Sequence, residues 1–369
     1  MNRSDSRGGR ELADTLLDLV LVGGDCTGVV GLAKNCGKTT TLNALTRAAA
    51  KRNIALGITS GGRDGELYDA ITGLPKPPIN VPRGALIALA NFTIERTSCR
   101  LEVVRRLGIR TTAGEIVIAR ALEPGRVEVI GCNRAKDLIQ AIAQLRECGA
   151  ELTLVDGAAG RTFLASPDVV QTFVLATGAA FDSDVRGIAD AARMAVHLFS
   201  LPEPPPRVAH RAEQAMESGV SAIVRADGRM EALPWPTLLG RESLVAAMMS
   251  PGDIGLVCTR AVGDELLAAL ASSLREHSPR AGVFLVVAAD PSKIAAGDRG
   301  VKAFEAAGGE LTVLRKARVV AVSVNPSSPS GIALDPSDLV IEVSKHVEEL
   351  PVFDIVAELS ASGGVMLET

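Results

Sequence analysis

The chain has few aromatic residues, and this scarcity narrows the classes of partner that it can recognise. Phe, Trp and Tyr make up 3% of its 369 residues, with one Trp and one Tyr. A surface that stacks the bases of single-stranded nucleic acid needs several aromatic side chains. A basic excess is also lacking, because 39 Lys and Arg stand against 43 Asp and Glu, for a formal net charge of −4. The sequence therefore predicts no nucleic-acid partner.

Long apolar runs and paired cysteines are missing as well. The runs TLLDLVLVGG and LVAAMM fall short of the roughly 20 apolar residues that cross a bilayer. The segment MNRSDSRGGRELAD lacks the apolar core of a secretory signal. The six cysteines form no C-x-x-C pair, and the four histidines show no ligand-like spacing. We therefore expect a cytoplasmic protein with no membrane partner, no disulfide framework and no structural zinc site.

What the sequence does contain is a long alternation of apolar strands and amphipathic helices. A length of 369 residues and a hydrophobic share of 47% suffice for two domains with their own cores. The pattern predicts a doubly wound, mainly parallel α/β sheet in residues 1–203 and a second, smaller α/β domain in residues 208–369. The proline-rich segment LPEPPPR, residues 201–207, is the predicted linker. The stretch NPSSPSG, residues 325–331, is interpreted as a turn or a ligand loop of the second domain.

The stretch VVGLAKNCGKTTTLNAL, residues 29–45, carries the strongest functional signal. It places a glycine-flanked loop between a short strand and a helix, which presents backbone N–H groups and a helix dipole to phosphate. Lys38 would reach the β- and γ-phosphates, and Thr39 would ligate Mg²⁺. The common P-loop is G-x-x-x-x-G-K-[ST], whereas one more residue separates the two glycines here. The residues predicted to bind nucleotide are Gly31, Lys34, Asn35, Gly37, Lys38, Thr39 and Thr40.

Acidic residues follow two later strands. Asp156 comes directly after the apolar run LTLV and before GAAG, so its carboxylate would hold Mg²⁺ together with Thr39. Asp64 and Glu66 follow the second strand in GITSGGRDGE. Because the carboxyl ends of parallel strands meet at one sheet edge, Asp64 or Glu66 would orient water there; a solvated loop explains them nearly as well. Lys38, Asp64 and Glu66 are the predicted catalytic residues.

The spacing G-x5-G-K-T, with the later acidic residue, resembles dethiobiotin synthetase and its relatives, which include cobyrinate synthetases and partition ATPases. More narrowly, GLAKNCGKTTTLNAL, GITSGGRDGE, GCNRAKD and LVDGAAGR resemble, in this order, the nucleotide-binding subunit of the reactivase for lysine 5,6-aminomutase and ornithine 4,5-aminomutase. The resemblance covers residues 27–203 and, more faintly, the stretch VNPSSPSG at residues 324–331. It implies a P-loop NTPase fold and an ATP-driven chaperone. Such a chaperone, with a second reactivase subunit, helps an adenosylcobalamin-dependent aminomutase to exchange damaged cofactor.

The expected activity is therefore Mg²⁺-dependent ATP hydrolysis, with ATP and Mg²⁺ as cofactors and a cobalamin-dependent aminomutase as partner. The sequence has no N-K-x-D stretch of the GTPase kind, which favours ATP over GTP, and no D-x-H-x-x-G stretch, so the partner would carry the cobalamin. Two alternatives stay open: an ATP-dependent small-molecule ligase, and a regulator that binds nucleotide without hydrolysis. In some relatives a lysine early in the loop crosses a dimer interface, so Lys34 leaves a homo-oligomer open as well.

Overall fold

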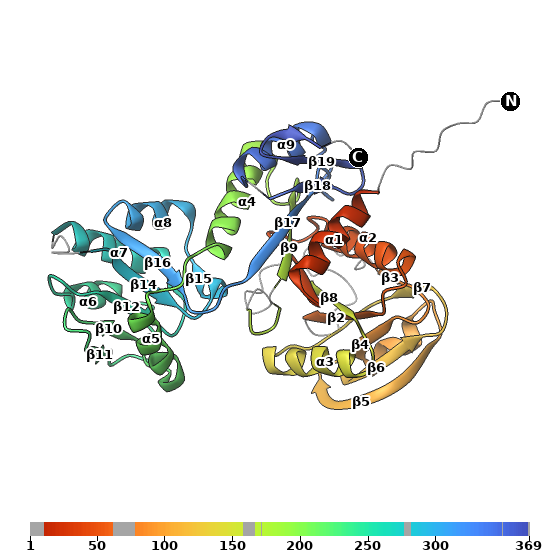
Figure 1. Cartoon of the computed structure of the whole chain (residues 1–369), viewed down its shortest axis with the longest axis horizontal. Helices are drawn as coiled ribbons and strands as arrows, with labels where there is room; N and C mark the ends of the chain where they lie inside the picture. Colours follow the sequence, from red (N-terminus) through yellow and green to blue (C-terminus); the bar gives the residue numbers. More distant parts are fainter. Residues whose placement is uncertain are drawn as a thin grey trace. The chain divides into compact units, whose positions relative to one another are not determined.

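The computed structural model has an α/β architecture and divides into two compact units (Figure 1). Unit 1 consists of Met1–Arg193 and Arg318–Thr369, and unit 2 consists of Met194–Ala317. Each unit contains parallel strands connected through helices, so the predicted α/β class is confirmed. The structure describes residues 11–61, 78–157, 167–170, 172–276, 282–348 and 350–367.

Unit 1 is built around an eleven-stranded sheet with the order β20-β19-β18-β17-β9-β1-β8-β2-β4-β6-β5. From β18 to β4 neighbouring strands run parallel, and antiparallel strands extend the sheet at both ends. The central strands are buried along almost their whole length because helices cover both of their faces. The strand bounds in this sheet are β1 Cys26–Gly31, β2 Leu56–Gly61, β4 Leu86–Ala90, β5 Leu101–Thr111, β6 Gly114–Ala121, β8 Leu152–Gly157, β9 Thr172–Gly178, β17 Arg318–Asn325, β18 Val352–Asp354, β19 Leu359–Ser362 and β20 Val365–Met366; a small separate ladder pairs β3 Ile79–Val81 with β7 Gly125–Val127.

Helices pack on both faces of this sheet, as the doubly wound prediction requires. On one face Leu16 and Leu42 join Ile58 of β2 in a single buried cluster. The next position along β2, Gly57, faces the opposite side, where a β-carbon would lie 3.4 Å from that of Leu145. This alternation follows from the two-residue period of a strand. The helices of unit 1 are α1 Leu12–Gly23, α2 Lys38–Lys51, α3 Ala135–Glu147, α4 Val185–Phe199, which runs on into unit 2, α9 Pro336–His346 and the 3₁₀ helix η1 Asn91–Arg96.

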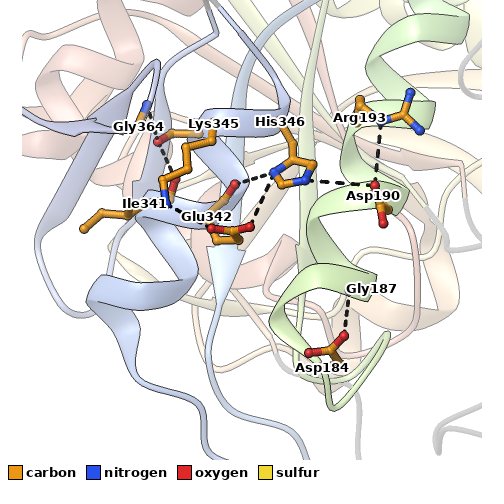
Figure 2. A network of polar contacts seen from close by, with 10 residues as sticks. Asp184, Gly187, Asp190, Arg193, Ile341, Glu342, Lys345, His346 and Gly364 are labelled. Atoms are coloured by element: carbon orange, nitrogen blue, oxygen red, sulfur yellow. Dashed lines mark hydrogen bonds and ion pairs between the residues drawn. The ribbon is translucent and has the colours of Figure 1, made fainter.

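A polar network joins α9 to α4 within unit 1 (Figure 2). His346 donates through Nδ1 to the carbonyl oxygen of Glu342 at 2.9 Å, and its Nε2 lies 4.0 Å from the Asp190 carboxylate on α4. Lys345 donates to the Glu342 side chain at 3.1 Å. This bond is the main reason that the pKa of Glu342 lies below its usual value. The network therefore gives α9 a polar attachment to α4.

Unit 2 has its own five-stranded sheet in the order β11-β10-β12-β14-β16, with β12, β14 and β16 parallel. Its core contains Phe284 and Phe304 among the largest fully buried side chains. The strands are β10 Ala222–Val224, β11 Met230–Ala232, β12 Gly255–Cys258, β14 Phe284–Ala288 and β16 Gly309–Val313, with the short pair β13 Val262–Gly263 and β15 Ile294–Ala295; the helices are α5 Pro206–Ser218, α6 Glu242–Ala247, α7 Asp264–Glu276, α8 Asp298–Glu305 and η3 Pro291–Lys293.

The division of the chain differs from the predicted boundaries of 1–203 and 208–369. After unit 2 the chain returns to the large sheet, because β17 pairs in parallel with β9 from Arg318 to Asn325. Unit 2 is therefore an insertion within unit 1. The predicted linker is also shorter than expected, since Pro206 is the first residue of α5, a position that tolerates proline. An apolar strand such as VVAVSV fits either sheet, so its composition does not reveal its neighbour.

None of the helices in the described ranges is both long enough and apolar enough to cross a membrane.

Candidate nucleotide site

The predicted phosphate loop connects β1 to α2 at the carboxyl end of the central strands. Its strand lies between β8 and β9, with Gly31 paired to Ala176. Lys38 is the first residue of α2. In open α/β sheets this edge is where ligands bind. The fold therefore brings the loop to the expected place.

Two residues of the loop adopt a left-handed backbone conformation. Asn35 has φ 60° and Gly37 has φ 95°. Between them, Cys36 turns inward and is 1% exposed. Its Sγ lies 2.9 Å from the carbonyl oxygen of Ala33 and 3.2 Å from that of Ala176 on β9. The thiol thus ties the loop to the neighbouring strand, which is a structural role.

Lys38 folds back over the loop. Its Nζ donates to the carbonyl oxygen of Ala33 at 3.0 Å and lies 3.9 Å from Cys36 Sγ. Gly31 makes room for this arrangement, because a β-carbon there would lie 2.5 Å from the sulfur and 2.8 Å from Nζ. The first glycine of the motif is therefore required by the packing of Lys38, even though it stands one position earlier than in the common motif.

The remaining loop residues surround the start of α2. Gly37 precedes the helix and has no side chain with which to cap it, so the first backbone N–H groups stay available to an anion. Thr39 is half-buried, while Thr40 and Lys34 are exposed. The predicted nucleotide-binding residues thus lie together around one helix N-terminus.

Asp156 lies on β8, the strand next to β1. It pairs in register with Val29 of β1 and with Ser60 of β2, and it is half-buried. The next residue, Gly157, packs closely against β1: a β-carbon there would lie 2.6 Å from the Val29 carbonyl oxygen. The structure therefore places this carboxylate on the strand beside β1, which carries the loop. Asp64 and Glu66, the other predicted acidic residues, lie outside the described residues.

The GCNRAKD segment reaches the same sheet edge. Cys132 donates its backbone N–H to the Ser60 carbonyl oxygen at 3.0 Å. Gly131 is in backbone contact with Ser60, since an added β-carbon would lie 1.7 Å from that oxygen. Burial, with a smaller effect of Asp137, raises the pKa of Cys132 to about 12, so this thiol stays protonated and unreactive. Helix α3 begins within the same segment, at Ala135.

Two residues of β17 were missed as part of this region by the sequence interpretation. Ser323 Oγ lies 2.7 Å from Thr41 Oγ1 in the first turn of α2. Asn325, the first residue of NPSSPSG, donates its side-chain amide to the Asn35 carbonyl oxygen at 3.4 Å. The interpretation placed this stretch in a second domain, whereas β17 belongs to unit 1. No local pattern signals the contact, because it depends on long-range strand pairing.

In the described ranges, no group of three or more His, Cys, Asp or Glu side chains could hold a metal ion. A scan against protein-family models and searches of curated proteins and of solved structures found no match. Inferences about function therefore rest on the residues of this chain.

Proposed function

We propose that the chain is a Mg²⁺-dependent ATPase with a P-loop at residues 31–40. One observation carries the proposal: Lys38 opens α2 directly after a glycine-flanked loop at the carboxyl end of β1, while Asp156 occupies the adjacent strand. A cation and backbone donors at the start of α2, with a carboxylate on the strand next to β1, suit a nucleotide held together with a metal ion. A parallel sheet whose strands are connected through helices is compatible with this activity.

The donor set fits ATP and Mg²⁺ by its chemistry. The N-terminus of α2 presents N–H donors and the positive end of a helix dipole to phosphate. Lys38 adds a full positive charge within the same loop. The Thr39 hydroxyl and the Asp156 carboxylate are oxygen ligands of the kind that Mg²⁺ takes. When bound, the ion supplies positive charge that offsets the charge on the phosphate oxygens.

Each side chain would have a separate task during hydrolysis. Lys38 would exchange the Ala33 carbonyl for a phosphoryl oxygen and stabilise the charge that develops there. Thr39 and Asp156 would hold the metal from two neighbouring elements. Asp64 or Glu66 would orient the attacking water. The chain thus contributes positioning and electrostatic stabilisation, which account for most of the catalysis in phosphoryl transfer.

We further propose that hydrolysis serves a partner protein, with the chain as the nucleotide-binding subunit of a reactivating chaperone for an adenosylcobalamin-dependent aminomutase. The resemblance of four segments to that reactivase supports this role. Residues 31–45, 131–137 and 154–157 of those segments lie at or lead into one sheet edge, which is what a shared nucleotide site requires. ATP turnover should then rise when the aminomutase is added.

Replacing Lys38 by Ala tests the ATPase proposal. We expect the variant to keep its fold and to lose about 100-fold or more in ATP turnover with Mg²⁺, because a charge aimed at the transferred phosphoryl is removed. Phosphate release measures turnover, and calorimetry measures the binding of ATP and GTP. Lys51→Ala, at the other end of the same helix, is the matched control and should behave like the wild type.

Three results would contradict parts of this proposal. A folded Lys38→Ala protein with wild-type turnover would exclude the assigned loop. ATP binding without Mg²⁺-dependent hydrolysis would favour the non-hydrolysing regulator. Turnover that appears only with a small carboxylate or amine acceptor, and does not respond to the aminomutase, would favour the ligase.

A further inference from the structure

The carboxyl end of β17 contacts the loop at residues 31–40, called the nucleotide loop below, although the two are almost 300 positions apart in the chain. In the sheet, β17 is separated from β1 only by β9. Ser323 pairs with Ala176, and Ala176 pairs with Gly31, so the three residues form one row across three strands. The side chains of β17 at and after Ser323 therefore lie close enough to contact the loop that follows Gly31.

Ser323 contacts the first turn of α2. Thr41 Oγ1 lies 3.1 Å from the Gly37 carbonyl oxygen and 2.7 Å from Ser323 Oγ. Because Thr41 has one hydroxyl proton and donates it to Gly37, Ser323 is the donor in the second bond. Thr41 and Ser323 are 1% and 3% exposed, so water does not compete for these bonds. A buried chain of hydroxyls thus connects β17 to the glycine before Lys38.

Asn325 contacts the loop itself, two residues further along β17. Its side-chain amide donates to Asn35 at 3.4 Å, and its Oδ1 accepts from the Ser327 N–H at 3.2 Å. The 3.4 Å bond is long, and direct packing supplements it: a β-carbon on Gly37 would lie 3.1 Å from that of Asn325. The Asn325 carbonyl accepts from Ala179 at 2.9 Å, which fixes the residue to the end of β9.

These contacts involve the part of the loop whose backbone conformation is least favourable. Asn35 and Gly37 both have left-handed backbone conformations, which cost free energy for a residue with a side chain and entropy for glycine. Such a conformation persists when the surroundings over-determine it. The contacts from β17 reach Asn35 and Gly37, on either side of Cys36.

We propose that Ser323 and Asn325 are positioning residues that preorganise the nucleotide loop before a ligand arrives. Ser323 holds the first turn of α2 through Thr41, and Asn325 holds Asn35 and packs on Gly37. Together they keep the one-residue-longer loop in the shape that directs Lys38 and the helix N-terminus to phosphate. The identity of the ligand rests on the proposed function, but the ordering of the loop does not.

The reactivity of Cys36 tests this ordering in the full chain without nucleotide. A buried thiol reacts with a soluble reagent only when its surroundings open locally. We expect Ser323→Ala and Asn325→Ala each to speed the labelling of Cys36 about fivefold, the effect of one lost hydrogen bond on an opening equilibrium. Peptide mass spectrometry measures labelling at each cysteine. Cys132, fully buried in the same unit, reports global opening and should label at the wild-type rate.

Two further variants separate local from general effects. Asn325→Asp keeps the acceptor for Ser327 and removes the donor to Asn35, so Cys36 should label faster in it as well. Ser344→Ala removes an equally buried hydroxyl on α9, away from the loop, and should leave Cys36 protected. Unchanged labelling of Cys36 in the β17 variants, or an equal rise at Cys36 and Cys132, would overturn the proposal.

Calorimetry measures how the ordering of the loop affects ligand affinity. Asn325→Ala should lower the affinities for ATP and for inorganic tripolyphosphate by the same factor, because both ligands would bind to the loop. A loss confined to ATP would instead assign Asn325 to the nucleoside and overturn its positioning role. If the wild type binds neither ligand, the proposed function fails, while the labelling of Cys36 still decides whether β17 orders the loop.

Discussion

Gly31 illustrates how closely single residues are constrained around the loop. Replacing it by Ala puts a methyl group within 3 Å of both the Cys36 sulfur and the Lys38 ammonium group. Since the sulfur is buried and cannot move outward, we expect Lys38 to be displaced. The Gly31→Ala protein should lose most of its nucleotide affinity in calorimetry and about 1–3 kcal/mol of unfolding free energy, the usual range for overpacking.

Gly263→Ala is the control for this substitution. A β-carbon at Gly263 meets only the flexible Glu265 carboxylate, at 3.5 Å. Stability and nucleotide affinity should therefore stay near the wild-type values. If Gly31→Ala binds nucleotide as tightly as this control does, the packing of Lys38 against Gly31 is not needed for nucleotide binding.

At the residue scale the sequence predicts contacts that are local in the chain. Lys38, Gly37 and Thr39 were assigned from spacing alone, and the structure brings them to one helix N-terminus. Local spacing cannot predict Ser323 or Asn325, because their contacts depend on which strand lies next to β9. The two carbonyl partners of Cys36 were not predicted either, because one of them belongs to Ala176 on a different strand.

At the scale of elements, Arg52 connects the end of α2 to α1. Its guanidinium lies 3.2 Å from the Asp14 carboxylate and 2.5 Å from that of Asp18, and it donates to the Asp14 carbonyl oxygen at 3.0 Å. The arginine is only partly exposed, so these bonds are less screened than most surface pairs. Arg52→Ala should therefore lower the free energy of unfolding by about 1–2 kcal/mol.

The neighbouring Lys51 provides the comparison. It forms one exposed pair with Glu11 at 2.6 Å, and Lys51→Ala should cost less than about 0.5 kcal/mol. Chemical denaturation of both variants measures the difference. Equal effects would mean that the multiple bonds of Arg52 add nothing beyond a single surface pair.

Sequence periodicity predicts elements that are buried on one or both faces. The helix predicted after the glycine-flanked loop is found at Lys38–Lys51, and the apolar run LTLV lies within β8. No strand is predicted at residues 101–111, where β5 lies. Most of β5 is exposed and two bulges interrupt its pairing, so neither apolar alternation nor an apolar run marks it.

At the scale of the whole molecule, the insertion of unit 2 predicts which fragments fold. A fragment of residues 1–203 lacks β17 and β18, and with them the core residues Val320, Ala321 and Phe353. We expect it to aggregate or to unfold without a cooperative transition. A fragment of residues 194–317 contains a complete core and should melt cooperatively. Circular dichroism and size-exclusion chromatography of both fragments make the comparison.

Domain boundaries were the least predictable feature at this scale. The two-domain count and the α/β class follow from length and alternation. The return of the chain to the first sheet does not, because the composition of a strand such as β17 does not reveal which strand it pairs with. A cooperative, monomeric 1–203 fragment would show that β17 is dispensable and would restore the predicted boundary.

The pairing of β17 with β9 has a consequence for limited proteolysis. A protease that cuts once after the exposed Glu203 divides the backbone into two pieces. The pieces remain held by the ladder that runs from Arg318 beside Thr172 to Asn325 beside Gly178. A denaturing gel should then show two bands and a native gel one, and excising the inserted unit would take a second cut near Arg318.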